Sequence, residues 1–223
     1  MDVEVMLLHE PGKLGSNVPD VAREMDLPAY EIAVNAEGTP LLPSIFETAF
    51  AHVQSSLTCY INADIIVLGP LAWAAAICAS RFERFLMIGQ RTDLDLQGKQ
   101  LDTDWRKHLW AAIQEHGVLH SPVGIDYFCT AGNVWGEIPP FALGRAAWDN
   151  WLVARALKLG IPVVDVTADV TIVHQTHPIA PGIRETPECK ENYRLLAELG
   201  DGGAGCAHAP WVLRDGTIEK RGN

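Results

Sequence analysis

Short apolar segments alternate along this chain with longer segments whose apolar residues repeat with helical spacing. The strand-like segments cover residues 3–9, 30–34, 59–68, 85–89, 125–130 and 163–174, and the last has room for one or two strands. The helix-like segments cover residues 18–25, 42–53, 71–81, 103–116, 148–159 and 186–200. Because alternating strands and helices pack into layers, we predict an α/β fold with a mainly parallel central sheet and helices on both faces.

The helical spacing is clearest in residues 42–53, where one face carries Leu42, Ile45, Phe46, Ala49, Phe50 and Val53. Gly69-Pro70 marks the end of a strand, and Gly117 suits the C-terminal cap of a helix. Asp215-Gly216 predicts the turn of a hairpin within residues 211–220. We therefore divide the chain into a main domain, residues 1–180, and a C-terminal helix and polar tail, residues 181–223, packed on it.

The composition fits one globular domain. The chain has 223 residues, of which 48% are hydrophobic and 20% charged, so a sizeable core is available. The formal net charge of -11 disfavours binding to nucleic acid or to an anionic membrane. No apolar run approaches the length of about 18 residues that spans a bilayer, and the acidic start lacks the basic region of a signal peptide. Five cysteines without a CxxC pair are typical of reduced core residues, so we expect a cytoplasmic protein. A homo-oligomer is left open.

Asn62-Ala63-Asp64 is the strongest local signal for chemistry. These residues interrupt an apolar run, and an unpaired carboxylate is costly in such a place. A metal ion bound by Asp64 would offset that cost. The alternative is that Asp64 caps a turn or pairs with an arginine, and the tripeptide alone leaves the two about equal.

A polar cluster follows the strand-like segment 85–89. It contains Arg91, Asp93 and Asp95, and ligands of open α/β sheets bind beyond the carboxyl ends of strands. Arg91 is therefore a candidate to bind a phosphate group, with Asp93 and Asp95 as further substrate-binding candidates. The alternative is a solvated loop with an internal Arg–Asp pair.

Two further acidic residues stand among apolar ones. Asp126 interrupts the run 125–130, next to Tyr127. Asp149 begins a helix-like segment between aromatic residues, and such a setting suits a carboxylate that binds or deprotonates a sugar hydroxyl. The alternatives are a carboxylate favoured by the helix dipole and tryptophans that pack in the core. The substrate-binding candidates of this region are Tyr127, Arg145, Trp148, Asn150 and Trp151.

Two histidines, His174 and His177, follow the apolar run 163–174. Residues at i and i+3 of an extended segment do not share a face. We therefore expect at most one of them to bind a metal, and prefer His174 because it ends the run.

Taken together, six motifs resemble a group of glycosyltransferase-like proteins with the GT-A, nucleotide-diphospho-sugar transferase fold. The motifs lie at residues 62–66, 89–93, 124–128, 139–145, 148–151 and 174–177. The resemblance runs from about Val3 to His177, and the combination is specific to that group, whereas each motif alone is not.

The resemblance implies roles for several residues. In GT-A enzymes an Asp-x-Asp motif binds a divalent metal that bridges the diphosphate of the donor, so Asp64 would bind Mn²⁺ or Mg²⁺ here. A later histidine often completes the metal shell, and His174 lies at a suitable place. An acidic residue at a helix start is often the catalytic base; Asp149 looks similar, with Asp126 as the second choice. Two features depart from the pattern: Asn62 replaces the first acid, and the strand and helix that usually begin the fold are expected to be missing.

These residues support a metal-dependent glycosyltransferase, of the hexosyl- or pentosyltransferase class, that moves a sugar from a nucleotide-diphospho-sugar to an unknown acceptor. A non-catalytic module that binds nucleotide-sugars or glycans on the same fold is the first alternative, based on Asn62 and the short start. A metal hydrolase that uses His174, His177 and Asp126 is the second alternative, although it would need more histidine ligands than the sequence offers.

Overall fold

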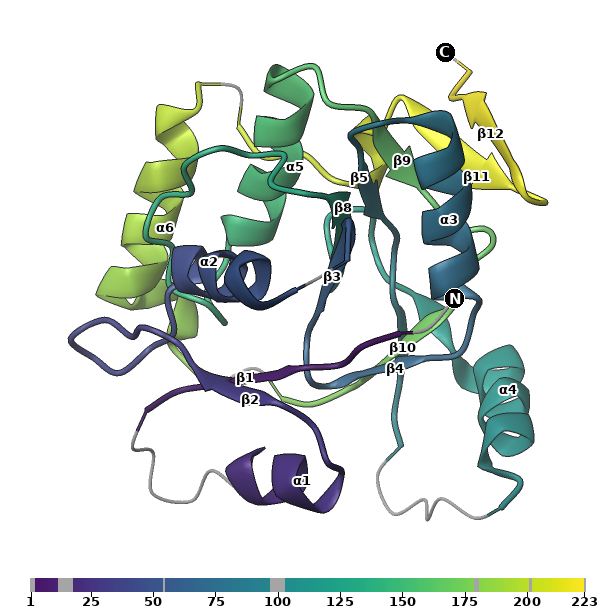
Figure 1. Ribbon diagram of the computed structural model, residues 1–223, viewed down its shortest axis with the longest axis horizontal. Coiled ribbons are helices and arrows are strands. Elements are labelled where there is room, and N and C mark those ends of the chain that lie inside the picture. Colours follow the sequence, from purple (N-terminus) through teal and green to yellow (C-terminus); the bar gives the residue numbers. More distant parts are fainter. Residues whose placement is uncertain are drawn as a thin grey trace.

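The computed structural model describes residues 3–11, 18–53, 55–96, 103–178, 181–200 and 202–222 (Figure 1). The helices are α1 (Val18–Glu24), α2 (Leu42–His52), α3 (Leu71–Arg81), α4 (Trp105–His116), α5 (Trp148–Lys158) and α6 (Pro187–Glu198), with short 3-10 helices at Ile183–Glu185 and Cys206–His208. The strands are β1 (Leu7–His9), β2 (Ala29–Glu31), β3 (Leu57–Ile61), β4 (Ile65–Val67), β5 (Leu86–Ile88), β6 (Thr92–Leu94), β7 (Val118–Leu119), β8 (Tyr127–Ala131), β9 (Val163–Asp165), β10 (Ile172–Gln175), β11 (Trp211–Arg214) and β12 (Thr217–Lys220).

The largest sheet has six strands in the order β12-β11-β9-β5-β8-β3. Strands β11, β9 and β5 are parallel, whereas β8 is antiparallel to both of its neighbours and β12 is antiparallel to β11. The α/β class is confirmed, but the prediction of a mainly parallel sheet is wrong, because this sheet is mixed. Apolar runs indicate strands without their direction, since a strand buried on both faces has a similar composition in either direction.

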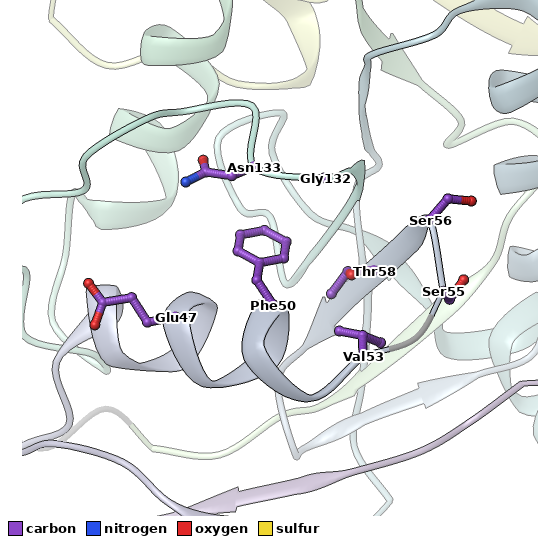
Figure 2. Close-up of a pocket in the computed structure, with 8 residues that line it drawn as sticks. All are labelled: Glu47, Phe50, Val53, Ser55, Ser56, Thr58, Gly132 and Asn133. Carbon is purple, nitrogen blue, oxygen red and sulfur yellow. The ribbon is translucent and has the colours of Figure 1, made fainter.

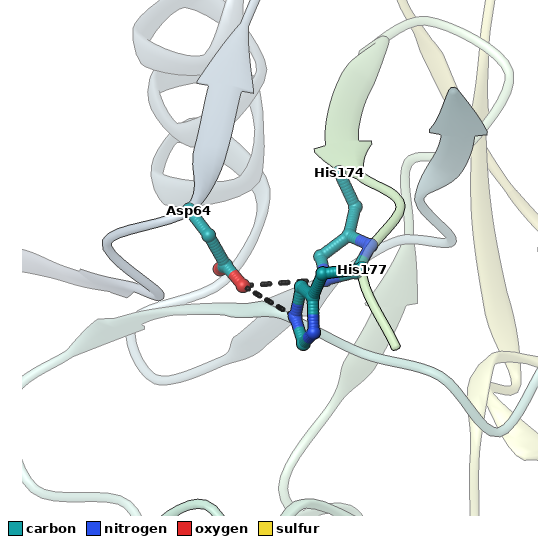
Figure 3. Close-up of side chains that lie close together, drawn as sticks. All are labelled: Asp64, His174 and His177. Carbon is teal, nitrogen blue, oxygen red and sulfur yellow. Dashed lines mark ion pairs between the residues drawn. The ribbon is translucent and has the colours of Figure 1, made fainter. Parts of the chain in front are cut away.

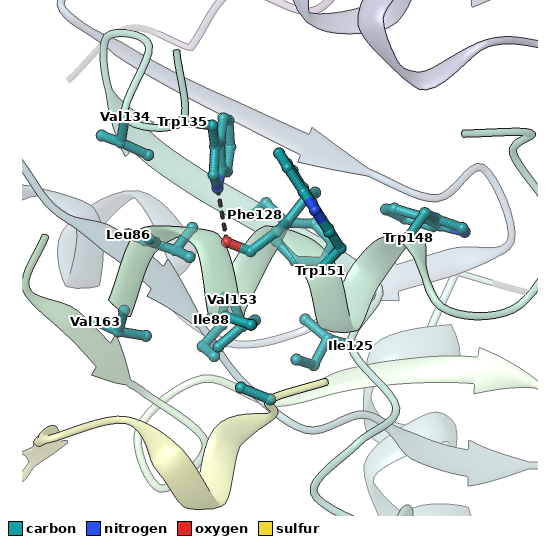
Figure 4. Packing of buried hydrophobic residues seen from close by; sticks show 14 of the residues in the cluster. Leu86, Ile88, Ile125, Phe128, Val134, Trp135, Trp148, Trp151, Val153 and Val163 are labelled. Atoms are coloured by element: carbon teal, nitrogen blue, oxygen red, sulfur yellow. Dashed lines mark hydrogen bonds between the residues drawn. The ribbon is translucent and has the colours of Figure 1, made fainter. Parts of the chain in front are cut away.

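Helices cover both faces of this sheet, as predicted. Strand β5 shows why, because its side chains alternate between two cores: Leu86 and Ile88 pack with α5 and α6, and Met87 packs with α3. Figure 1 shows α5, α6 and α2 on one side of the sheet and α3 on the other. The core under α5 contains several tryptophans, and the indole N–H of Trp135 donates a hydrogen bond of 2.8 Å to the carbonyl of Leu152 (Figure 4).

A second sheet of four strands, in the order β4-β10-β6-β7, lies beside the first. Strand β10 is antiparallel to β4 and parallel to β6, and His174 is the register partner of both Ile65 and Asp93. This pairing brings segments far apart in the sequence to adjacent positions. Two further strands, β1 and β2, form a separate parallel pair.

The predicted helices are confirmed, and so is the hairpin at Asp215-Gly216. The run 59–68 is split by a turn into β3 and β4, and the run 163–174 contains two strands. The polar cluster after β5 contains a strand, β6, that the sequence analysis missed. Within the described residues, no helix is long and apolar enough to cross a membrane.

The C-terminal tail extends the six-stranded sheet, because β11 pairs with β9. Arg221 fixes this tail: its guanidinium lies 2.6 Å from the carboxylate of Asp165 and 3.0 Å from the carbonyl of Cys206. The cysteines are free, and all except Cys59 are buried.

Candidate functional site

The turn between β3 and β4 contains Asn62 and Asp64, whose side chains contact different neighbours. The Asn62 side chain donates to the carboxylate of Asp126 at 2.7 Å and accepts from the Tyr60 hydroxyl at 2.7 Å. Its backbone N–H also donates to the Asp126 carbonyl at 2.9 Å. The amide at position 62 therefore fixes the turn to the start of β8, while Asp64 remains exposed.

Asp64 meets His174, which lies on β10, and His177, which follows the strand (Figure 3). Its Oδ2 atom lies 3.2 Å from Nε2 of His174 and 3.6 Å from Nε2 of His177. The expectation that the histidines do not share a face is wrong, because β10 ends at Gln175 and His177 lies beyond the strand. One donor atom from each of the three residues lies within 4.8 Å of the others, and carboxylate with imidazole is a donor set that divalent metals use.

Asp93 contacts three side chains next to this cluster: Arg91, His120 and His174. Its carboxylate accepts from Nε of Arg91 at 2.8 Å and lies 2.5 Å from Nδ1 of His120. It also lies 3.2 Å from Nδ1 of His174, although that nitrogen makes no hydrogen bond within the described residues. Burial alone would raise the pKa of Asp93, but His120, Arg91 and His174 lower it below its usual value.

Arg91 also bonds to Asp126, through Nη1 at 3.2 and 2.9 Å from the two carboxylate oxygens. The Asp126 side chain is only 6% exposed and that of Arg91 19%. Both residues are therefore held in a charged network that includes Asn62.

A pocket of about 560 Å³ unites most of the candidates from the sequence. Its lining contains Asn62, Asp64, Arg91, Asp126, Arg145, Trp148 and Asp149, together with Tyr60, Glu10, Pro40 and Leu143. Asp64 thus connects the histidine cluster to the pocket, and Asp149 faces the same space from the first turn of α5.

The two acidic candidates for a base differ in their surroundings. Burial raises the pKa of Asp149 to about 6, and the negative charge of Asp126 adds to that effect. Backbone N–H groups at the start of α5 and the charge of Arg91 act in the opposite direction. Asp149 therefore titrates near neutral pH, which suits a group that exchanges a proton.

Arg145 forms another wall of the pocket. Its guanidinium lies 2.6 Å from the carboxylate of Glu188 in α6, which also accepts from Asn35 at 2.6 Å. Burial opposes the charge of Glu188, but hydrogen bonds from Thr39, Asn35 and Arg145 hold its pKa below the usual value. The cation of Arg145 is thus paired with the Glu188 carboxylate.

Six candidates are outside the pocket lining. Asp93 and His174 belong to the neighbouring cluster at Asp64, and the other four lie elsewhere. Tyr127 is fully buried in the core under α3, and its hydroxyl has no hydrogen-bond partner in the described part of the chain. Trp151 packs against Phe141 in the core. Figure 4 shows Trp151 among the buried hydrophobic residues around α5. Asn150 donates to the backbone carbonyls of Val123 and Ala204. Asp95 is exposed at the end of β6.

Tyr60, His120 and Glu10 were not predicted from the sequence, and His177 had no role in the preferred site. Tyr60 lies in an apolar run, so nothing in the neighbouring sequence indicated a role for its hydroxyl. Burial is the chief cause that raises the pKa of this hydroxyl. His120 follows a short strand that was not predicted. The His174–His177 spacing was visible but was interpreted with strand periodicity.

A second groove of about 510 Å³ lies between the C-terminal end of α2 and the ends of β3 and β8 (Figure 2). It is lined by Glu47, Phe50, Val53, Ser55, Ser56, Thr58, Gly132 and Asn133. These side chains include one charged group and no histidine, so the 560 Å³ pocket is the stronger candidate for chemistry. Neither protein-family models nor curated proteins match this sequence.

Proposed function

We propose that this chain is a metal-dependent glycosyltransferase that moves a sugar from a nucleotide-diphospho-sugar to an acceptor hydroxyl. The observation that carries the proposal is that Asp64 and Asp149 line one pocket. The first belongs to a cluster of side chains of the types that bind metals, and the second has a pKa raised to about 6. A metal-dependent transferase needs a metal ligand and a base close enough together to act on the same bound substrate.

The residues divide the task between the two ends of the pocket. Asp64 and His174 would hold the cation, which neutralises the charge of the departing diphosphate when bound. Asp149 would accept the proton of the acceptor hydroxyl, since a base titrating near the working pH is effective. Asp126 is less suited to that role, because Arg91 and Asn62 already donate to its oxygens.

The contacts of Arg91 and Arg145 are more complex than the role of binding a phosphate group that the sequence predicted for Arg91. Because Arg91 bonds to Asp93 and Asp126, it holds the carboxylates in place. Arg145 is paired with Glu188, so a bound phosphate would share its guanidinium with that carboxylate or displace it.

The alternative is a non-catalytic module that binds nucleotide-sugars or glycans in the same pocket. The observation in its favour is Asn62, whose side chain is engaged by Tyr60 and Asp126 and does not add a second carboxylate beside Asp64. The metal hydrolase considered from the sequence would use Asp126, but the carboxylate beside the histidines is Asp64.

A thermal-shift screen of UDP-, GDP- and dTDP-sugars, with and without Mn²⁺, tests the proposal. A donor that binds the folded state should raise the melting temperature, and more so with Mn²⁺. Acceptor mixtures are then assayed for release of the nucleoside diphosphate. Binding without turnover would favour the module, and a screen in which no donor raises the melting temperature would refute the transferase.

A further inference from the structure

We propose that Asp64, His174 and His177 form a mononuclear site that binds a transition-metal ion such as Zn²⁺ without any nucleotide. The site stands on these three side chains and does not require the transferase activity. It differs from a metal held jointly with a diphosphate, because the protein alone supplies three donors.

The distances between the donor atoms carry the argument. Oδ2 of Asp64 lies 3.2 Å from Nε2 of His174 and 3.6 Å from Nε2 of His177. Donors around a tetrahedral ion, bonded at about 2.0–2.1 Å, lie roughly 3.3 Å from one another. The imidazole rings are 5.2 Å apart between centroids and inclined by 52°, so they approach the same oxygen from different directions (Figure 3). Small side-chain shifts would complete the arrangement.

His174 is also held in place before any ion binds. It is 8% exposed and lies on β10, between β4 and β6. Its Nε2 faces Asp64, while Nδ1 has Oδ1 of Asp93 at 3.2 Å and no hydrogen bond among the described residues. Metal-binding histidines almost always donate their other ring N–H to a carboxylate, carbonyl or water, and Asp93 is placed for that role.

The donor types select the metal. Two imidazoles and one carboxylate suit Zn²⁺, Co²⁺ and similar ions, whereas Mg²⁺ prefers oxygen donors and keeps much of its water. We therefore expect strong preference for transition metals over Mg²⁺. The remaining coordination positions would be open to water or substrate, because the described residues offer three donors in this cluster.

Calorimetric titration of the chelator-treated full chain with Zn²⁺, Co²⁺ and Mg²⁺, in the absence of nucleotide, tests the site. We expect a single Zn²⁺ or Co²⁺ ion per chain, and visible absorption of Co²⁺ typical of nitrogen ligands. His177→Ala should weaken Zn²⁺ binding by more than about 100-fold, because it removes a ligand. Asp93→Asn changes only a partner of the ligand His174, so it should weaken binding by about 10–100-fold. His177 is exposed, so this variant keeps the fold. His116→Ala, an exposed histidine on α4, is the matched control and should bind as the wild type does.

Absence of Zn²⁺ binding without nucleotide would overturn the inference and leave the transferase proposal standing. Equal affinity in His177→Ala and the wild type would also overturn it. Tight Zn²⁺ binding by a protein whose melting temperature rises with no nucleotide-sugar would support this site and refute the proposed function.

Discussion

Nη1 of Arg91 lies 2.9 Å from Oδ2 of Asp126, and both residues line the pocket of about 560 Å³. Both side chains are largely withdrawn from water, so removal of the cation leaves a buried carboxylate without its partner. We expect Arg91→Ala to lower the free energy of unfolding by about 3 kcal/mol or more, measured by urea denaturation. Arg91→Lys should recover part of the loss, because lysine keeps the charge but not the paired geometry.

The matched control is Arg23→Ala. Arg23 pairs with Asp20 at 2.9 Å, but the two side chains are 77% and 68% exposed. Such a pair contributes less than about 1 kcal/mol. Similar losses in the two variants would show that the Arg91–Asp126 pair is not effectively buried.

Asp149→Asn tests the proposed base. The substitution keeps the size of the side chain and removes the proton acceptor, so transfer should fall by about 10²–10⁴-fold once an acceptor is known. Affinity for the nucleotide should survive, because the base contacts the acceptor. Turnover within a few-fold of the wild type would instead identify Asp149 as a carboxylate that only stabilises the start of α5.

The pH dependence of stability gives an independent test of the same residue. The folded pKa of Asp149, about 6, lies above the value of about 3.9 expected when the chain is unfolded. The folded protein therefore holds the proton more tightly, and stability falls as the pH rises from about 4 to about 6.

At pH 7.5 the buried charge costs up to about 3 kcal/mol, so Asp149→Asn should be more stable than the wild type by a part of that amount. The advantage should shrink below about pH 5. Unfolding curves across this range measure it, and a less stable variant at pH 7.5 would contradict the raised pKa.

Asp64→Ala should abolish Mn²⁺-dependent nucleotide binding with little effect on the fold, because the side chain is 42% exposed. Calorimetry with UDP and Mn²⁺ is the measurement, and the melting temperature reports the fold. Glu219→Ala, on the exposed strand β12, is the control for loss of a surface carboxylate. Unchanged metal-dependent binding in Asp64→Ala would exclude this residue as a ligand.

Local patterns in the sequence were sufficient for the helices and for several turns. The i, i+3, i+4 spacing of apolar residues in α2 predicts which face of the helix is buried. That spacing follows from the geometry of the helix alone. Thr186-Pro187 indicated the start of α6, where the Thr186 hydroxyl accepts from the N–H of Cys189 at 3.2 Å. Asp215 and Gly216 both adopt positive φ, 47° and 74°, as the tight hairpin turn requires.

The sequence also singled out Asn62, Asp64, Asp126 and Asp149 as polar residues in apolar surroundings, and Arg91 as part of a polar cluster after a strand. The pocket contains all five. Their mutual contacts depend on strand order and direction, which local periodicity does not encode, because the partner of a strand can come from anywhere in the chain. The register of β10 against β6 places His174 opposite Asp93. The departure of the chain from β10 after Gln175 then brings His177 to Asp64. The residue types capable of chemistry were thus visible in the sequence, whereas the pairing of strands decided which of them meet.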